Sequence, residues 1–295
     1  MHNRHNRHSR FKIISESRPE LLILTGYPTL RWIVYMHTHN LLPESAESMQ
    51  TETTIAEWNA ALEAVAEEML DEAQIIAPPV DAALIARRLR ITVAIDRSLQ
   101  PRGVHKRLSG RSSIFVRPDD RPERLQWAVA HELGESTAYR VCEKLMLPDE
   151  DVAAADRETW ANLLAARLML PRQWFFEDAT RLNGDVLELK TIYRTSSHEA
   201  IAWRLLDLLR PTVITIFDQG HITSRRANTG FSPPQLESLE KNCWQDVHQV
   251  QKSRTHCQRG LQVQCWPVHE PGWRREILRT TTLDEFADMG TDDWD

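Results

Sequence analysis

Apolar side chains first recur at a helical spacing after residue 54. The stretch TIAEWNAALEAVAEEML (54–70) places apolar residues three or four positions apart, and Thr54 with Glu57 forms the T-x-x-E pattern of a helix N-terminus. The period then changes to two, with Ile91, Val93 and Ile95 expected to point inward. We therefore predict a long helix followed by a small sheet of three strands, formed by ITVAID (91–96), GVHKRL (103–108) and SSIFVRP (112–118).

Helical spacing returns from about residue 121 and continues to about 210. Pro122 lies in the first turn of a helix that carries AVAHELGESTAYR (128–140). Further on, Ser196 and Glu199 form an S-x-x-E pattern that predicts the start of another helix, and Pro211 stops it.

The last 85 residues have a different character. VITIFDQGHITSRR predicts a hairpin that turns at Gln219-Gly220, SPPQLESLEKNCWQDVHQV predicts an amphipathic helix, and LQVQCW alternates like a strand. We expect an α+β protein with a boundary near Pro211: a mainly helical, zincin-like domain with the three-stranded sheet, then a smaller C-terminal α/β module. The predicted divisions are a poorly ordered segment at 1–50, that domain at 51–210 and a module of unknown role at 211–295.

Composition narrows the functional classes. The chain has 295 residues and a formal net charge of -6, so it lacks the basic character of a general nucleic-acid binder, and we expect no direct nucleic-acid contact. Its four cysteines form no C-x-x-C pair, which favours free thiols and a cytoplasmic location. The apolar stretch 21–35 is interrupted by Gly26, Pro28 and Arg31, so we expect neither a membrane span nor a signal peptide.

The segment HELGE (131–135) holds the candidate chemistry. His131 and Glu135 are four residues apart, so a helix places them on one face, about 6 Å apart along its axis. H-E-x-x-H is the zinc site of many metallopeptidases, in which the glutamate accepts a proton from the attacking water. Here Glu135 stands at the position of the second histidine. Glu158, near the start of the next predicted helix, is the candidate third ligand, and Gly134 lets another backbone come close.

The stretch from about 60 to 210 resembles the ImmA/IrrE-type metallopeptidase-like family. The most specific pieces are ERLQWAVAHELGE (123–135) and ETWANLLAARLMLP (158–171). The resemblance implies that His131 and Glu158 are metal ligands and that Glu132 is the general base. It also implies a protein-cleaving role in stress or mobile-element regulation, in which the protein acts on helix-turn-helix repressors. Glu135 departs from the family pattern, which has histidine at this position, and that departure bears on catalysis more than on the fold.

The substitution at Glu135 has a physical consequence. A divalent ion held by His131, Glu135 and Glu158 has no net charge in its first shell, so it acidifies a bound water less than a two-histidine site does. Carboxylates still bind zinc, and the oxygen-rich shell also suits manganese. Three alternatives stay open: an altered but working site, a site without metal or catalysis, and a plain surface helix.

We therefore expect a metal-dependent endopeptidase-like regulator with Glu132 as catalytic base and His131, Glu135 and Glu158 as ligands of zinc, or of manganese. Its partner would be a protein, such as a DNA-binding repressor. The rival hypothesis is a non-catalytic protein of the same fold that sequesters a repressor without cutting it.

Overall fold

The computed structural model describes residues 55–283, except 109, 149–153, 230–231 and 271. The predicted segment 1–50 and the predicted cap at Thr54 lie outside the described residues. The helices are α2 (Ile55–Glu72), α3 (Ala82–Arg88), α4 (Pro122–Leu145), α5 (Ala154–Met169), α6 (Arg172–Arg181), α7 (Val186–Ile192), α8 (His198–Arg204) and α9 (Ser238–Val250), with a 3-10 turn η2 (Leu205–Asp207). The strands are β1 (Thr92–Ile95), β2 (Gly103–Leu108), β3 (Arg111–Val116), β4 (Thr212–Asp218), β5 (His221–Ala227), β6 (Arg254–Gln258), β7 (Leu261–Pro267) and β8 (Arg275–Thr282).

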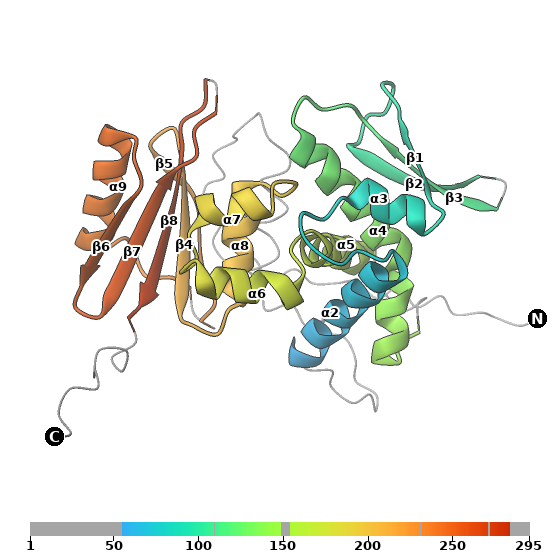
Figure 1. Cartoon of the computed structure of the whole chain (residues 1–295), viewed down its shortest axis with the longest axis horizontal. Coiled ribbons are helices and arrows are strands. Elements are labelled where there is room, and N and C mark those ends of the chain that lie inside the picture. The colour runs from blue at the N-terminus through green and yellow to red at the C-terminus, as the bar shows by residue number, and fades with distance from the viewer. Residues whose placement is uncertain (1–54, 109, 149–153, 230–231, 271, 284–295) are drawn as a thin grey trace, which may run out of the picture.

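The first half of the described chain packs around helix α4 (Figure 1). Helices α2 and α5 lie against α4, and the three-stranded sheet, in the order β1-β3-β2, covers another side of it. The close pairing of α4 with α5 requires a glycine, because a Cβ added at Gly134 would lie 2.6 Å from the carbonyl oxygen of Ala161. The backbone approach that the sequence predicted at Gly134 is thus present, and it brings the two candidate site helices together.

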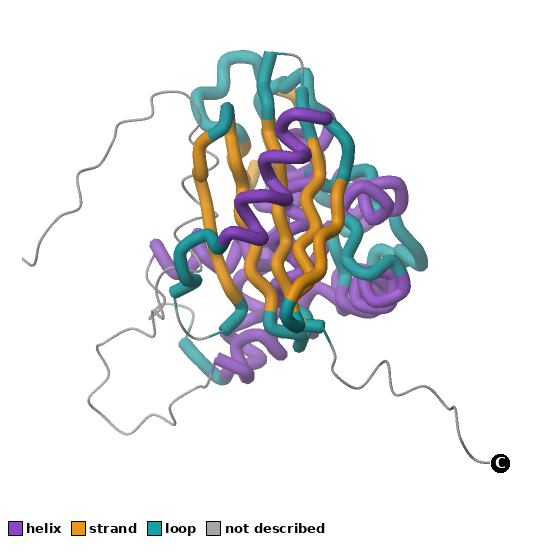
Figure 2. Tube along the Cα trace, turned by 90° about the vertical axis from the view of Figure 1, so that its left-hand side faces the viewer, coloured by secondary structure: helices purple, strands orange, loops and turns teal. Residues whose placement is uncertain are grey.

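The second half is a five-stranded antiparallel sheet in the order β5-β4-β8-β7-β6. Helix α9 runs across one face of this sheet, and the helices of the first half lie behind the other face (Figure 2). Side chains of the inner face, such as Ile214, Ile216 and Trp266, belong to the same buried core as those helices. The sheet is therefore tied to the helical half by a continuous apolar core.

These observations confirm the α+β class, the three-stranded sheet and the turn at Gln219-Gly220, where both residues have positive φ. Two local predictions are wrong. Ile95 is not inward but 58% exposed, because it ends a strand at the open edge of the sheet. Helix α8 is capped by Ser197, whose side chain accepts the backbone N–H of Ala200, and not by Ser196.

Candidate metal site

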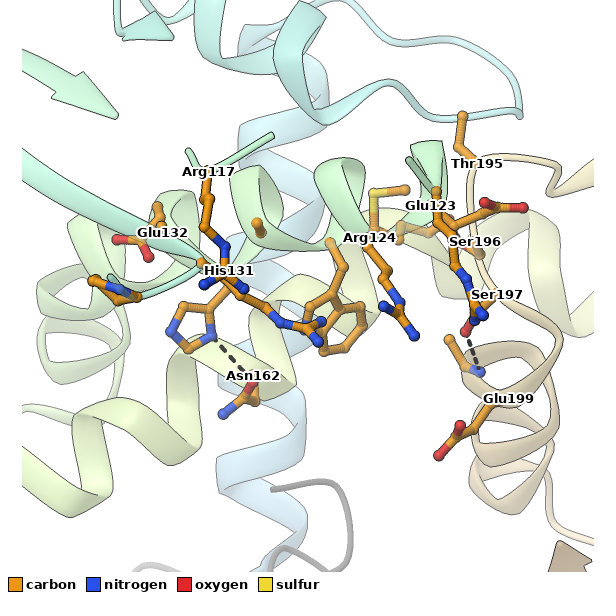
Figure 3. Close-up of a pocket in the computed structure, with 18 of the residues that line it drawn as sticks. Arg117, Glu123, Arg124, His131, Glu132, Asn162, Thr195, Ser196, Ser197 and Glu199 are labelled. Carbon is orange, nitrogen blue, oxygen red and sulfur yellow. Dashed lines mark hydrogen bonds between the residues drawn. The ribbon is translucent and has the colours of Figure 1, made fainter. Parts of the chain in front are cut away.

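A cavity of about 990 Å³ lies where the two halves meet. Its wall combines the beginnings of β2 and α4, the HELGE segment, α5, the start of α8 and the loop between β7 and β8. His131, Glu132, Glu135 and Glu158 all line it, so the fold brings every predicted site residue to one cavity. Figure 3 shows His131 and Asn162 facing each other from neighbouring helices on one side of this cavity.

Asn162 fixes the orientation of two of the candidate ligands. Its Nδ2 donates to the backbone carbonyl of Glu158 at 2.9 Å, so its Oδ1 must be the atom that faces His131 Nδ1 at 3.1 Å. An oxygen only accepts, and the proton of the neutral imidazole is therefore on Nδ1. The lone pair of His131 is then on Nε2, which points to Glu158 Oε2 at 3.5 Å. The same Nδ2 also lies 3.3 Å from Glu158 Oε1.

The spacing of His131 and Glu158 fits a shared ion. Two ligand atoms ~2.1 Å from a tetrahedral zinc lie about 3.4 Å from each other. The Nε2–Oε2 distance of 3.5 Å is close to this value. On the other side, the ligand atoms of His131, Glu132 and Glu135 all lie within 4.8 Å of one another, whereas Glu158 is not a member of that mutual group. Glu158 thus contacts His131 but not the other two acidic residues of the group. Glu135 is exposed and lies on the solvent side of His131.

Glu132 has the environment of a group that handles protons. The residue is only 4% exposed, and its Oε2 has no hydrogen-bond partner among the described residues. Burial, opposed by the charge of His131 and reinforced by the neighbouring carboxylate of Glu135, raises the pKa of Glu132 to about 7. The carboxyl group is pressed against β2, because a Cβ added at Gly103 would lie 2.6 Å from Glu132 Oε1.

The two facing ligands perturb each other. Burial by itself would lower the pKa of His131, but its contact with Glu158 and the charges of Glu158 and Glu132 outweigh burial and raise it. The contact with His131 lowers the pKa of Glu158, against a smaller effect of burial. The pair therefore favours an ionised Glu158, which is the form that binds a metal, together with a protonated His131, which must lose its Nε2 proton to bind one.

Two residues of this site were missed by reasoning from the sequence. Asn162 could have been identified from its four-residue spacing from Glu158, because this spacing places both residues on one face of α5. Gly103 could not be found, because its role depends on how the sheet packs on α4. Cys142 and Cys243 are buried free thiols, in agreement with the expectation of free cysteines.

No family model matches the sequence, and no curated protein matches it. A solved structure described as a Mycobacterium tuberculosis transcriptional regulator is similar in fold. The match has a TM-score of 0.55 and 18% sequence identity, and it covers 79% of this chain and 81% of that chain. At this identity the likeness shows the fold alone, which extends through both halves of the chain. Among the described residues, no helix is both long and apolar enough to cross a membrane.

Proposed function

We propose that the protein is a metal-dependent endopeptidase-like regulator that acts on a protein partner. One observation carries the proposal: Asn162 holds His131 and Glu158 at the spacing of two ligands of one ion, beside a buried glutamate with an unpartnered oxygen. A chance H-E-L-G segment on a surface helix is not expected to lie beside a carboxylate that an asparagine holds in this way. The resemblance to the ImmA/IrrE-type family, drawn from the motifs of both helices, agrees with this arrangement.

The residues present fit a divalent ion. His131 and Glu158 would hold it, with Glu135 as a further carboxylate ligand, and the donor set of one imidazole and carboxylates suits zinc or manganese. Such an ion supplies Lewis acidity, which makes a water more acidic and polarises a peptide carbonyl. Asn162 keeps the imidazole in the tautomer that leaves Nε2 free, as outer partners of metal-binding histidines commonly do.

Glu132 supplies the proton transfer in this proposal. The attacking water forms a bond to the carbonyl carbon and loses a proton, which Glu132 Oε2 accepts. When the carbon–nitrogen bond breaks, the same proton passes to the amine that leaves. Burial at 4% exposure keeps bulk water away from this carboxyl group, and the backbone at Gly103 holds it in place.

The partner is proposed to be a DNA-binding regulator. The family resemblance points to helix-turn-helix repressors as partners. The solved structure of similar fold is itself described as a transcriptional regulator, which agrees with a regulatory role for the chain but names no partner. The chain's net charge of -6 argues for contact with such a protein over direct contact with DNA.

The test is to incubate the full chain with repressor-like proteins encoded beside its gene, with zinc, with manganese and with a chelator. Metal-dependent fragments are expected from the wild type. Glu132→Gln keeps the shape of the side chain but cannot take the proton, so cleavage should fall by roughly 10²- to 10⁴-fold while metal binding persists. Full cleavage by this variant would remove Glu132 from the mechanism.

A second candidate function is favoured by Glu135, which replaces the second histidine of the motif and is exposed. In this alternative the protein binds and sequesters the repressor without cutting it. The same incubation separates the two functions, because a stable complex without fragments, formed equally well with chelator present, supports the binding protein.

A further inference from the structure

Four arginines gather at the end of the cavity where β2, β3 and α4 meet. Arg102 precedes β2, Arg117 follows β3, and Arg121 and Arg124 lie at the start of α4; all four line the cavity. Figure 3 shows Arg117 close to His131, with Arg124 further along the cavity. The metal chemistry proposed above uses none of these side chains.

Their charges are only partly balanced within the described residues. Arg121 pairs with Glu270, and Arg124 lies 3.6 Å from Asp119. Arg117 donates to the backbone carbonyl of Gln100, and neither Arg117 nor Arg102 forms an ion pair within the described part of the chain. These two guanidinium groups therefore have no carboxylate partner there.

Burial and the neighbouring arginines both perturb the pKa of Arg102. Burial lowers its pKa first, the charges of Arg124, Arg117 and Arg121 lower it further, and Asp119 alone raises it. Holding like charges together in a half-buried place costs free energy unless an anion shares the site. Helix α4 adds to this field, because its N-cap residue is Arg121, which offers no side-chain cap, and the N-terminus of a long helix carries partial positive charge.

The open edge of strand β2 begins at the same end of the cavity. In the order β1-β3-β2, strand β2 has no partner on its outer side among the described residues. Its first residues, Gly103 and Val104, line the cavity beside Glu132. An extended peptide that adds to such an edge gains main-chain hydrogen bonds, and neighbouring side chains then select its residues.

We propose that the arginine cluster, formed by Arg102, Arg117, Arg121 and Arg124, is a specificity site for an aspartate or glutamate in an extended segment of the partner protein. A carboxylate there can accept paired N–H bonds from a guanidinium, an arrangement that also fixes direction. Because Arg102 directly precedes β2, a peptide lying along β2 passes the cluster and the candidate metal site together. This inference deepens the proposed function and rests on it for the protein partner, though not for cleavage.

Binding can be tested without cleavage. The full chain carrying Glu132→Gln is immobilised and used to select a random 12-residue peptide library. The same selection is run on three versions of this protein: Arg102→Ala with Arg117→Ala, Arg117→Glu, and Arg97→Ala. Arg97 is the matched control, since it is an exposed arginine in the loop after β1 and does not line the cavity. Melting temperatures check that all versions are folded.

The expected result is enrichment of Asp and Glu over Asn and Gln at one or two peptide positions, in the parent and in the Arg97 control. The double variant should lose this preference, and Arg117→Glu should shift it toward Lys and Arg. For a selected peptide, exchanging the acidic residue for its amide should raise Kd by roughly 10- to 100-fold in the parent and little in the double variant.

Three results would overturn the inference. Peptides enriched without acidic preference, or with one that survives in the double variant, remove the specificity site but leave the protein partner in place. Absence of selected peptides, together with calorimetric binding of inorganic phosphate that the double variant loses, makes the cluster a small-anion site. Absence of both peptide and phosphate binding removes this inference and weakens the proposed function as well.

Discussion

Asn162 offers the clearest way to perturb the candidate metal site without touching a ligand. Its side chain contacts His131 Nδ1 at 3.1 Å and Glu158 Oε1 at 3.3 Å, so Asn162→Ala removes one hydrogen bond from each of two ligands. Each such bond contributes about 0.5–1.5 kcal/mol. If the loss of both hydrogen bonds appears fully in the free energy of zinc binding, that binding weakens by about 1–3 kcal/mol, or roughly 5- to 150-fold. This range agrees with the 10- to 100-fold that outer partners of metal ligands typically contribute.

The assay is a zinc titration against a chromophoric chelator, with unfolding by denaturant measured on the same samples. Thr137→Val is the matched control, because it removes a buried hydroxyl from α4, on the same helix pair, but from a residue bonded to Leu133 and to no ligand. Zinc affinity should fall for Asn162→Ala and stay unchanged for Thr137→Val. Equal affinities for wild type and Asn162→Ala would refute the claim that Asn162 orients the ligands.

Three further predictions concern packing and pH. Gly134→Ala should lower the free energy of unfolding by about 1–3 kcal/mol, although alanine normally stabilises a helix interior, because the new methyl group meets Ala161 at 2.6 Å; a stabilised variant would show that the helices separate freely. Gly103→Ala should displace Glu132 and abolish cleavage while zinc still binds, and retained cleavage would contradict this packing. Burial and the charge of Lys190 lower the pKa of His198 to about 4, so the unfolded chain binds a proton more readily than the native one between pH 6.5 and 4. The contribution of His198 to stability should therefore fall as pH drops through this window, by at most about 3 kcal/mol and with a sign opposite to that of Glu132. The stability of the wild type relative to His198→Asn should fall by this amount in pH-dependent denaturant unfolding.

The period of the apolar residues was enough to predict most elements of the fold. Strand β2 has the predicted bounds, and the hairpin turn lies at the predicted pair Gln219-Gly220. Strands β6 and β8 were not predicted. The two local errors fall at element ends, where one residue decides exposure or capping: Ile95 faces solvent, and Ser197 replaces Ser196 as the cap. Local patterns contain little information at these ends, because neighbouring residues offer almost equivalent hydrogen bonds.

The candidate site was predictable where it depends on helical spacing within one segment. His131, Glu132 and Glu135 follow from the four-residue repeat of α4. Contacts between segments, such as Gly103 against Glu132 and the meeting of four arginines from different elements, depend on the tertiary arrangement. The continuous core across Pro211 was likewise not expected, because the change in pattern near that residue marks a change of architecture and contains no information on packing.

The central claim is that HELGE, together with Glu158, forms a metal site in which Glu135 is a ligand. The most direct measurement is calorimetric titration of zinc into wild type, Glu135→His and Glu135→Ala. One ion per chain is expected in the wild type. Binding should be tighter for Glu135→His, since imidazole suits zinc and removes a negative charge from the shell, and much weaker for Glu135→Ala. The same affinity in all three proteins, or zinc bound by the histidine variant alone, would contradict a ligand role for Glu135.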